Sequence, residues 1–375
     1  MEYLFMFLLL IIVYVYIGYP ILLMILNLER KANLIKNEFT PTVTLFIPVY
    51  NEAKIIKEKI SNSLALDYPK EKLQIIVASD GSNDDTVNIV KDFLGEGVIL
   101  LESVKRCGKN SIINEYLPQC NGEIIVFTDA NAFFNMDAIK KLVRNFNNET
   151  VGCVVGNLRY VDEKTSIGKG EGLYFRYESL IKKLESRHGT LVAATGSIYA
   201  IRKKQFTQLD LDVANDFAHP IQLAAMGYKI LFEPEAIAHE KATSSAADEF
   251  KRRSRIVTRG ITAFMRYWRP YHMLRGMWGF CFISHKLLRW FIPFFLIVIF
   301  LSNIFLRSPF FKFTLYSQFA FYFMALIGVF FKSRLGRFFA IPHYFCVINL
   351  AAFIGIMRYF SGKRQAIWEV AKTTR

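Results

Sequence analysis

The hydrophobic positions divide the chain into an apolar segment at its start, a central region of short apolar runs, and long apolar segments near its end. Residues 3–28 carry no charge and exceed the roughly 20 residues that a membrane-spanning helix needs. A cleaved signal peptide has a basic start and a shorter apolar core, so we expect this segment to be retained as an anchor.

Between about residue 40 and residue 240, short apolar runs alternate with longer mixed segments, which is typical of repeated strand–helix–strand units. Polar residues follow several of these runs directly. Because open α/β sheets bind ligands at the carboxyl ends of their strands, the pattern predicts a binding crevice there. The runs predict strands at 43–47, 73–78, 98–101 and 124–127, and a helix at 53–64.

The composition changes again after Pro270. Residues 271–290 mix Arg, Lys, His and Trp with apolar residues, which favours a helix at the level of the lipid headgroups. Residues 291–306 and 313–331 are apolar enough to cross a membrane. Residues 338–357 contain proline, histidine and asparagine, so we expect a re-entrant or interfacial segment there and only two crossings after the central domain.

Charge and cysteine content narrow the class of protein. The net charge is +15, and a basic cluster at 29–36 follows the first apolar segment, which predicts a cytosolic domain after it. Basic residues beside apolar segments favour lipid headgroups and diphosphates as partners, and no nucleic-acid recognition module is visible. Five cysteines without paired spacing predict neither a zinc site nor disulfides, and they fit a reducing compartment.

The strongest chemical motif is Asp129-Ala130-Asn131, which ends the apolar run at 124–127. An acid and a second side-chain oxygen two residues later suit a hard divalent cation that also binds a diphosphate. The segments 48–52 and 80–86 also follow predicted strands, although either alone is explained as a turn and the start of a helix.

Together these motifs are more specific than any one of them. The segments 48–52, 80–82, 108–109, 129–131 and 215–216 occur in the order and spacing of the inverting family 2 glycosyltransferases, which the chain resembles from about residue 40 to its end. The resemblance implies an α/β GT-A domain with a Rossmann-like mixed sheet and membrane helices at both ends. The expected parts are an anchor at 1–29, a cytosolic catalytic domain at 30–270, an interfacial helix at 271–290 and membrane segments with a cytosolic tail at 291–375.

The resemblance also implies roles for individual residues. It gives the general base to Asp216 and a Mg²⁺ or Mn²⁺ ion to Asp129 and Asn131. Partial burial beside apolar neighbours would raise the proton affinity of Asp216 toward that of a base, and an ordinary helix cap is the less favoured alternative for an acid there. The residues matched to donor binding are Pro48, Tyr50, Glu52, Asp80, Lys109, Asp129 and Asn131, with Asp80 accepting a hydrogen bond from the base.

Acceptor-side residues match the family less closely. Gly196 resembles a glycine that lets a sugar approach the backbone, although a turn before a strand explains it equally well. Residues 252–256 stand in the place of a Gln-x-x-Arg-Trp motif, where only Arg255 matches and Ile256 replaces tryptophan. Arg252 and Arg255 either bind a diphosphate or acceptor phosphate or form a basic face against headgroups. Trp368 lies in a tail that resembles a segment closing over the nucleotide.

The expected protein is a membrane-bound inverting hexosyl- or N-acetylhexosaminyl-transferase. It would move a sugar from a nucleotide diphosphate, in the first place UDP, to a glycan or lipid-linked acceptor in surface polysaccharide or glycolipid synthesis. The catalytic domain would lie on the cytoplasmic side of the plasma or inner membrane, with other subunits of an assembly complex as further partners. The missing tryptophan favours single additions over a polymer. The alternative is a catalytically weak scaffold subunit, while an oxidoreductase lacks its Gly-x-Gly-x-x-Gly turn.

Overall fold

The computed structural model describes residues 1–29, 38–161, 166–243, 245–269, 274–330 and 336–362. The strands are β1 Val43–Val49, β2 Leu73–Ser79, β3 Val98–Glu102, β4 Ile124–Phe127, β5 Phe133–Phe134, β6 Val151–Val161, β7 Tyr199–Arg202 and β8 Lys229–Lys241. The helices of the sheet domain are α3 Ile56–Leu64, α4 Thr86–Lys91, α5 Lys109–Tyr116, α6 Ala138–Val143, α7 Ser166–Ser186, α8 Asn215–Ala225 and α9 Ala246–Tyr267. The remaining helices are α1 Glu2–Val13, α2 Tyr19–Leu26, α10 Met277–Phe282, α11 Leu288–Phe305, α12 Pro309–Phe330 and α13 Gly336–Phe360.

The strands form one mixed sheet in the order β3-β2-β1-β4-β7-β6-β8-β5. The first four are parallel to one another, and β7 runs antiparallel to β4 and β6. The carboxyl ends of β1, β2 and β4 therefore meet at one edge of the sheet, as the sequence predicts. Each predicted strand is present, and β1, β2 and β3 continue one or two residues further than predicted.

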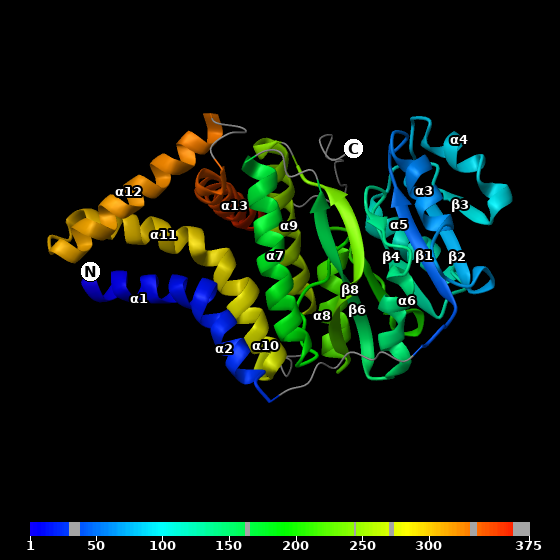
Figure 1. Ribbon diagram of the computed structural model, residues 1–375, viewed down its shortest axis with the longest axis horizontal. Coiled ribbons are helices and arrows are strands. Elements are labelled where there is room, and N and C mark those ends of the chain that lie inside the picture. Colours follow the sequence, from blue (N-terminus) through cyan, green and yellow to red (C-terminus); the bar gives the residue numbers. More distant parts are fainter. Residues whose placement is uncertain (30–37, 162–165, 244, 270–273, 331–335, 363–375) are drawn as a thin grey trace.

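Both faces of the sheet are covered, which explains the continuous apolar runs in the sequence. Leu45 and Ile47 of β1 pack into one cluster together with residues of α3 and α6. Phe46 points to the other face and packs into a second cluster, which contains residues of α5 and α8. In Figure 1, α7 and α9 lie between the sheet and the apolar helices, so the sheet domain and these helices share a broad contact.

Four helices among the described residues are long and apolar enough to cross a membrane. They are Glu2–Leu26, Met277–Phe305, Pro309–Val329 and Phe338–Phe360. Figure 1 shows α1, α11 and α12 extending away from the sheet domain. The expected division at residue 290 falls inside one continuous helix, because a π-helical turn at Ile283–Leu287 joins α10 to α11.

Helix α13 differs from the other three because half of its apolar window is buried, against 11% to 28% for the others. Its Gly355 lies so close to α9 that an added Cβ would stand 2.9 Å from the Cβ of Val257. The hydroxyl of Thr258 also donates to the carbonyl of Gly355 at 2.8 Å. The segment at 338–357, which we expected to be re-entrant or interfacial, is instead part of one continuous helix, long and apolar enough to cross a membrane, that packs on the helix carrying the arginines. Three such helices, not the two expected, therefore follow the sheet domain among the described residues.

Candidate active site

The loops that follow β1 and β2 are bonded to each other. Asn51 adopts a positive φ of 53°, a conformation that asparagine tolerates better than most residues. Its backbone N–H donates to the Ser82 hydroxyl at 3.1 Å, and its side-chain amide donates to Asn83 at 2.7 Å. The next N–H, that of Glu52, donates to the Thr86 hydroxyl at 2.8 Å. These bonds place the two predicted nucleoside-binding segments side by side.

Asp80 lies beneath the loop that precedes α5. Its fully buried carboxylate accepts the backbone N–H groups of Cys107 at 2.6 Å and Gly108 at 3.0 Å. Burial raises the pKa of Asp80, and these two bonds oppose that rise. The structure thus shows Asp80 anchoring a loop, and its predicted bond to a nucleotide base stays a prediction. In the same loop, the Arg106 guanidinium lies 3.7 Å from the ring centre of Tyr50, a stacking contact that the sequence analysis missed.

Asp129 follows β4, and Lys109 begins α5. The Lys109 amine and an Asp129 carboxylate oxygen are 2.6 Å apart, and the two side chains are 14% and 36% exposed. A partly buried pair of this kind interacts more strongly than a surface pair, because water screens it less. The lysine expected over the donor and the acid expected to bind its diphosphate thus lie in direct contact.

Asp216 lies in the first turn of α8 and faces Gly196. The Gly196 N–H donates to the Asp216 carboxylate at 3.2 Å. A Cβ added to Gly196 would stand 3.3 Å from Asp216 Oδ2 and 3.5 Å from Asp129 Oδ2, so both carboxylates approach the same small residue. Burial raises the pKa of Asp216 and Asp129 adds to the rise, while the Lys109 ammonium opposes it.

Asn131 is oriented by a buried acid that the sequence analysis did not single out. Its side-chain amide donates to Glu240 Oε1 at 2.5 Å, and the Ser197 hydroxyl donates to Glu240 Oε2 at 3.0 Å. Burial raises the pKa of Glu240 to about 7. Across the described residues there is no group of three or more His, Cys, Asp or Glu placed to hold a metal ion. The ligands predicted for a cation, the Asp129 carboxylate and the Asn131 amide oxygen, would need further oxygens, which a bound diphosphate could supply.

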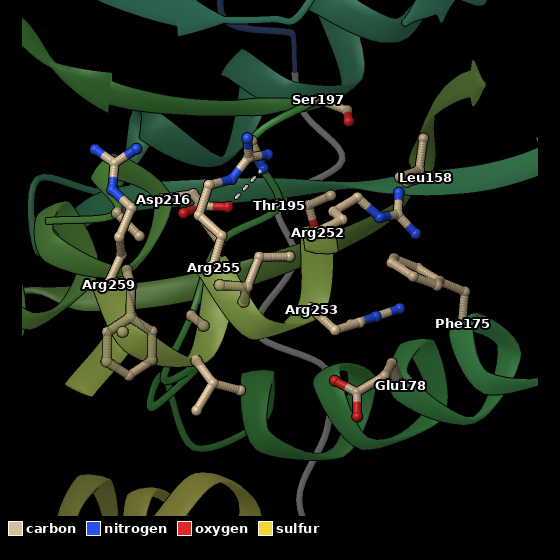
Figure 2. Close-up of a pocket in the computed structure, with 18 of the residues that line it drawn as sticks. Leu158, Phe175, Glu178, Thr195, Ser197, Asp216, Arg252, Arg253, Arg255 and Arg259 are labelled. Carbon is tan, nitrogen blue, oxygen red and sulfur yellow. Dashed lines mark hydrogen bonds between the residues drawn. The ribbon is translucent and has the colours of Figure 1, made fainter. Parts of the chain in front are cut away.

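Helix α9 carries the predicted arginines, and Figure 2 shows Arg255 near Asp216, while Arg252 points toward the side of Leu158 and Phe175. Arg252 is bonded to Glu249 at 2.9 Å and to Glu171. Arg255 lines the cavity, as does Arg259 one turn further along. The buried Arg259 donates to the backbone carbonyl of Val213, ahead of α8, and burial lowers its pKa to about 10. Arg259 is a third residue, after Arg106 and Glu240, that the sequence analysis missed.

A single cavity of about 370 Å³ contains most of the predicted site. Pro48, Tyr50 and Asp80 do not line it, although they belong to described segments next to it. Trp368 lies outside the described residues, so its predicted role stays a prediction. The predicted residues that line the cavity are Glu52, Lys109, Asp129, Asn131, Gly196, Asp216, Arg252 and Arg255.

Comparison of the sequence with known proteins finds glycosyltransferases. The glycosyl transferase family 2 profile matches residues 44–205. Poly-beta-1,6-N-acetyl-D-glucosamine synthase of Staphylococcus aureus is 27% identical over 233 residues, which are 60% of this chain and 56% of that protein. The Staphylococcus epidermidis synthase is 25% identical over 248 residues, 64% of this chain and 60% of that protein. The chain thus spans little more than half the length of the curated relatives it matches.

The fold has a solved counterpart. The mannosyltransferase PcManGT from Pyrobaculum calidifontis, solved with GDP-Man and Mn²⁺, superimposes with a TM-score of 0.75 at 21% identity. The match covers 96% of this chain and 99% of that one, so it includes the apolar helices as well as the sheet domain. Residues 44–205 therefore form a glycosyltransferase family 2 domain within a chain that has the GT-A fold.

Proposed function

We propose that the chain is a membrane-bound inverting glycosyltransferase. It would move a sugar from a nucleotide-diphosphate donor, in the first place a UDP-sugar, to a glycan or lipid-linked acceptor. The observation that carries the proposal is the approach of Asp129 and Asp216 to Gly196 inside one cavity, with Asp129 and Gly196 within the region that matches the family 2 profile. The matched synthases are named for an N-acetylglucosamine polymer, which supports an N-acetylhexosamine or hexose as the transferred sugar.

Asp216 is the proposed general base. Single displacement at a sugar carbon requires the acceptor hydroxyl to lose its proton as the new bond forms. Burial raises the pKa of Asp216, so its carboxylate binds a proton more readily than an exposed aspartate does. Gly196 leaves room beside this carboxylate, and its N–H fixes the direction of one oxygen. An acceptor hydroxyl placed there would have a base within reach.

Asp129, Asn131 and Lys109 form the proposed diphosphate end of the site. The amide of Asn131 is bonded through its nitrogen to Glu240, which leaves its oxygen to face a cation. A Mg²⁺ or Mn²⁺ ion held by Asp129 and Asn131 would offset charge on the departing diphosphate. The Lys109 ammonium contributes positive charge at the same place, and Arg252 and Arg255 line the cavity as further phosphate-binding candidates.

The apolar helices give the proposal its membrane setting. We propose that residues 1–29 anchor the chain, that 30–270 form the catalytic domain on the cytoplasmic side, and that the later helices hold it against the bilayer. The basic cluster at 29–36 supports this orientation, because excess Lys and Arg mark the cytoplasmic side. The packing of α13 on α9 supports a fixed position of the site relative to the membrane.

The test is release of nucleoside diphosphate from a panel of nucleotide sugars, with membranes that contain the chain and added Mg²⁺ or Mn²⁺. We expect one donor to be consumed, and Asp216→Asn and Asp129→Ala to stop its consumption. Asp67→Asn is the matched control, since Asp67 is exposed and pairs with Lys140 at the surface. If no donor is consumed while native acceptors are present, the chain is instead a catalytically weak scaffold subunit. The roles proposed for Asp129 and Asp216 are then wrong.

A further inference from the structure

The cavity continues past the reacting residues to a cluster of charged side chains between α7 and the helix Met277–Phe305. Glu178 and Lys182 line it from α7, and His285, Lys286 and Arg289 line it from the other helix. The π-helical turn Ile283–Leu287 carries His285 and Lys286. Such turns often occur at functional sites. The proposed transfer reaction, as described above, uses none of these five side chains.

Two buried acids bind most of this cluster together. Glu178 accepts from Lys286 at 3.4 Å and from Arg289, and it lies 3.1 Å from His285 Nε2. Glu185 lies 2.7 Å from His285 Nδ1. Each ring nitrogen of His285 faces a carboxylate. A protonated imidazole would therefore add one positive charge to the cluster.

Positive charge exceeds negative charge in this cluster. Lys182 adds a third ammonium or guanidinium group to Lys286 and Arg289, and its amine donates to the Thr195 hydroxyl. Three basic side chains, those of Lys182, Lys286 and Arg289, thus accompany the two acids. Within the described part of the chain, Nε and Nη2 of Arg289 are buried without a hydrogen-bond partner. Buried surplus charge and unused donors are costly, and an anion that accepts from Arg289 would relieve both costs.

The other walls of this part of the cavity come from helices that are apolar enough to cross a membrane. Trp290 belongs to Met277–Phe305, Ile348 and Ala352 belong to Phe338–Phe360, and Tyr16 belongs to the first helix. A soluble anionic glycan would gain little from such walls, whereas a hydrocarbon chain would bury apolar surface against them.

We propose that this end of the cavity, formed by Lys182, Lys286 and Arg289, binds the phosphate of an acceptor whose hydrocarbon chain lies in the membrane. The inference rests on the proposed function, because it names the acceptor of the same site. Figure 2 shows Glu178 and Asp216 apart from each other, with arginines of α9 between them in this view. The phosphate is therefore an anchor, and a hydroxyl further along the acceptor is the group that Asp216 would deprotonate.

The experiment measures binding of a long-chain polyisoprenyl phosphate, and of the corresponding alcohol, to the purified full chain in nanodiscs. UDP binding in the presence of Mn²⁺ is measured on the same samples. We expect the phosphate to bind more tightly than the alcohol, and Arg289→Gln and Lys286→Gln each to weaken it about tenfold, as loss of a charged hydrogen bond does. Lys312→Gln, in an exposed lysine of α12 that does not line the cavity, is the matched control.

Retained UDP binding shows that a variant is folded, and Arg289→Lys should recover part of the phosphate affinity. Equal binding of phosphate and alcohol overturns the inference, as does unchanged phosphate affinity in both glutamine variants. Binding of a soluble glucuronate oligosaccharide in place of the polyisoprenyl phosphate also overturns it. Failure of the wild-type chain to bind UDP counts against the proposed function instead. If the glutamine variants still weaken polyisoprenyl phosphate binding in that case, the anion site is supported on its own.

Discussion

Lys59 of α3 is a fully buried lysine beneath the turn that carries Asp129 and Asn131. Its amine donates to the Thr128 hydroxyl at 2.9 Å and to the carbonyl of Ala132, so it joins the two ends of that turn. Burial lowers its pKa from 10.5 to about 7, although the nearby Asp129 carboxylate opposes the shift. The substitution Lys59→Met keeps the length of the side chain and removes both hydrogen bonds.

Two effects of known size determine the result. Leaving the Ala132 carbonyl and the Thr128 hydroxyl without this donor costs about 1–3 kcal/mol for a buried group. The second effect depends on pH. Unfolded Lys59 keeps its proton up to about pH 10.5, whereas folded Lys59 releases it near 7. Between these values unfolding takes up a proton, so a rise in pH favours the folded wild type by at most about 1.4 kcal/mol per pH unit.

The assay is thermal unfolding of the full chain in detergent at pH 7 and pH 9, with wild type, Lys59→Met and Lys57→Met. Lys57 is an exposed lysine of the same helix and serves as the matched control. We expect the stability of Lys59→Met to fall relative to that of wild type between pH 7 and pH 9, by at most about 2.7 kcal/mol, while Lys57→Met follows wild type. A difference between Lys59→Met and wild type that stays constant, or that shifts in favour of Lys59→Met as the pH rises, would refute the reasoning about the buried amine.

Three further predictions concern the site and its support. Gly196→Ala places a methyl 3.3 Å from Asp216 Oδ2, so we expect roughly tenfold lower turnover with unchanged UDP affinity, and equal turnover would contradict a close approach there. The Lys109 ammonium lowers the pKa of Asp216, so Lys109→Met should move the acidic limb of kcat/KM to higher pH; a limb that stays in place argues against Asp216 as the base. Gly355→Leu would meet the Cβ of Val257 at 2.9 Å, and we expect a loss of about 1–3 kcal/mol, measured as a lower melting temperature than that of an exposed Leu350→Ala control.

Several features of the protein are readable from the sequence because they depend on local pattern. Strands buried on both faces appear as continuous apolar runs, so 43–47 and 124–127 were placed correctly before the structure. Because the polar residues that end those runs meet at one edge of a parallel sheet, the sequence predicts a crevice beside Asp129, whereas the place of Lys109 over the donor was implied only by the family resemblance. The first apolar segment likewise formed the helix that its length predicts.

Other features required the tertiary structure, because they join residues that no local pattern relates. Asn131 and Glu240 are 109 positions apart, and only the pairing of β8 within the sheet brings the acid beneath the metal motif. The stacking of Arg106 on Tyr50 depends on the fold of a loop. The excess of cations beside Glu178 arises where α7 meets a helix about a hundred residues further along the chain. A sequence shows which side chains are apolar or charged, and the balance of charge in a cavity is decided only when distant elements pack.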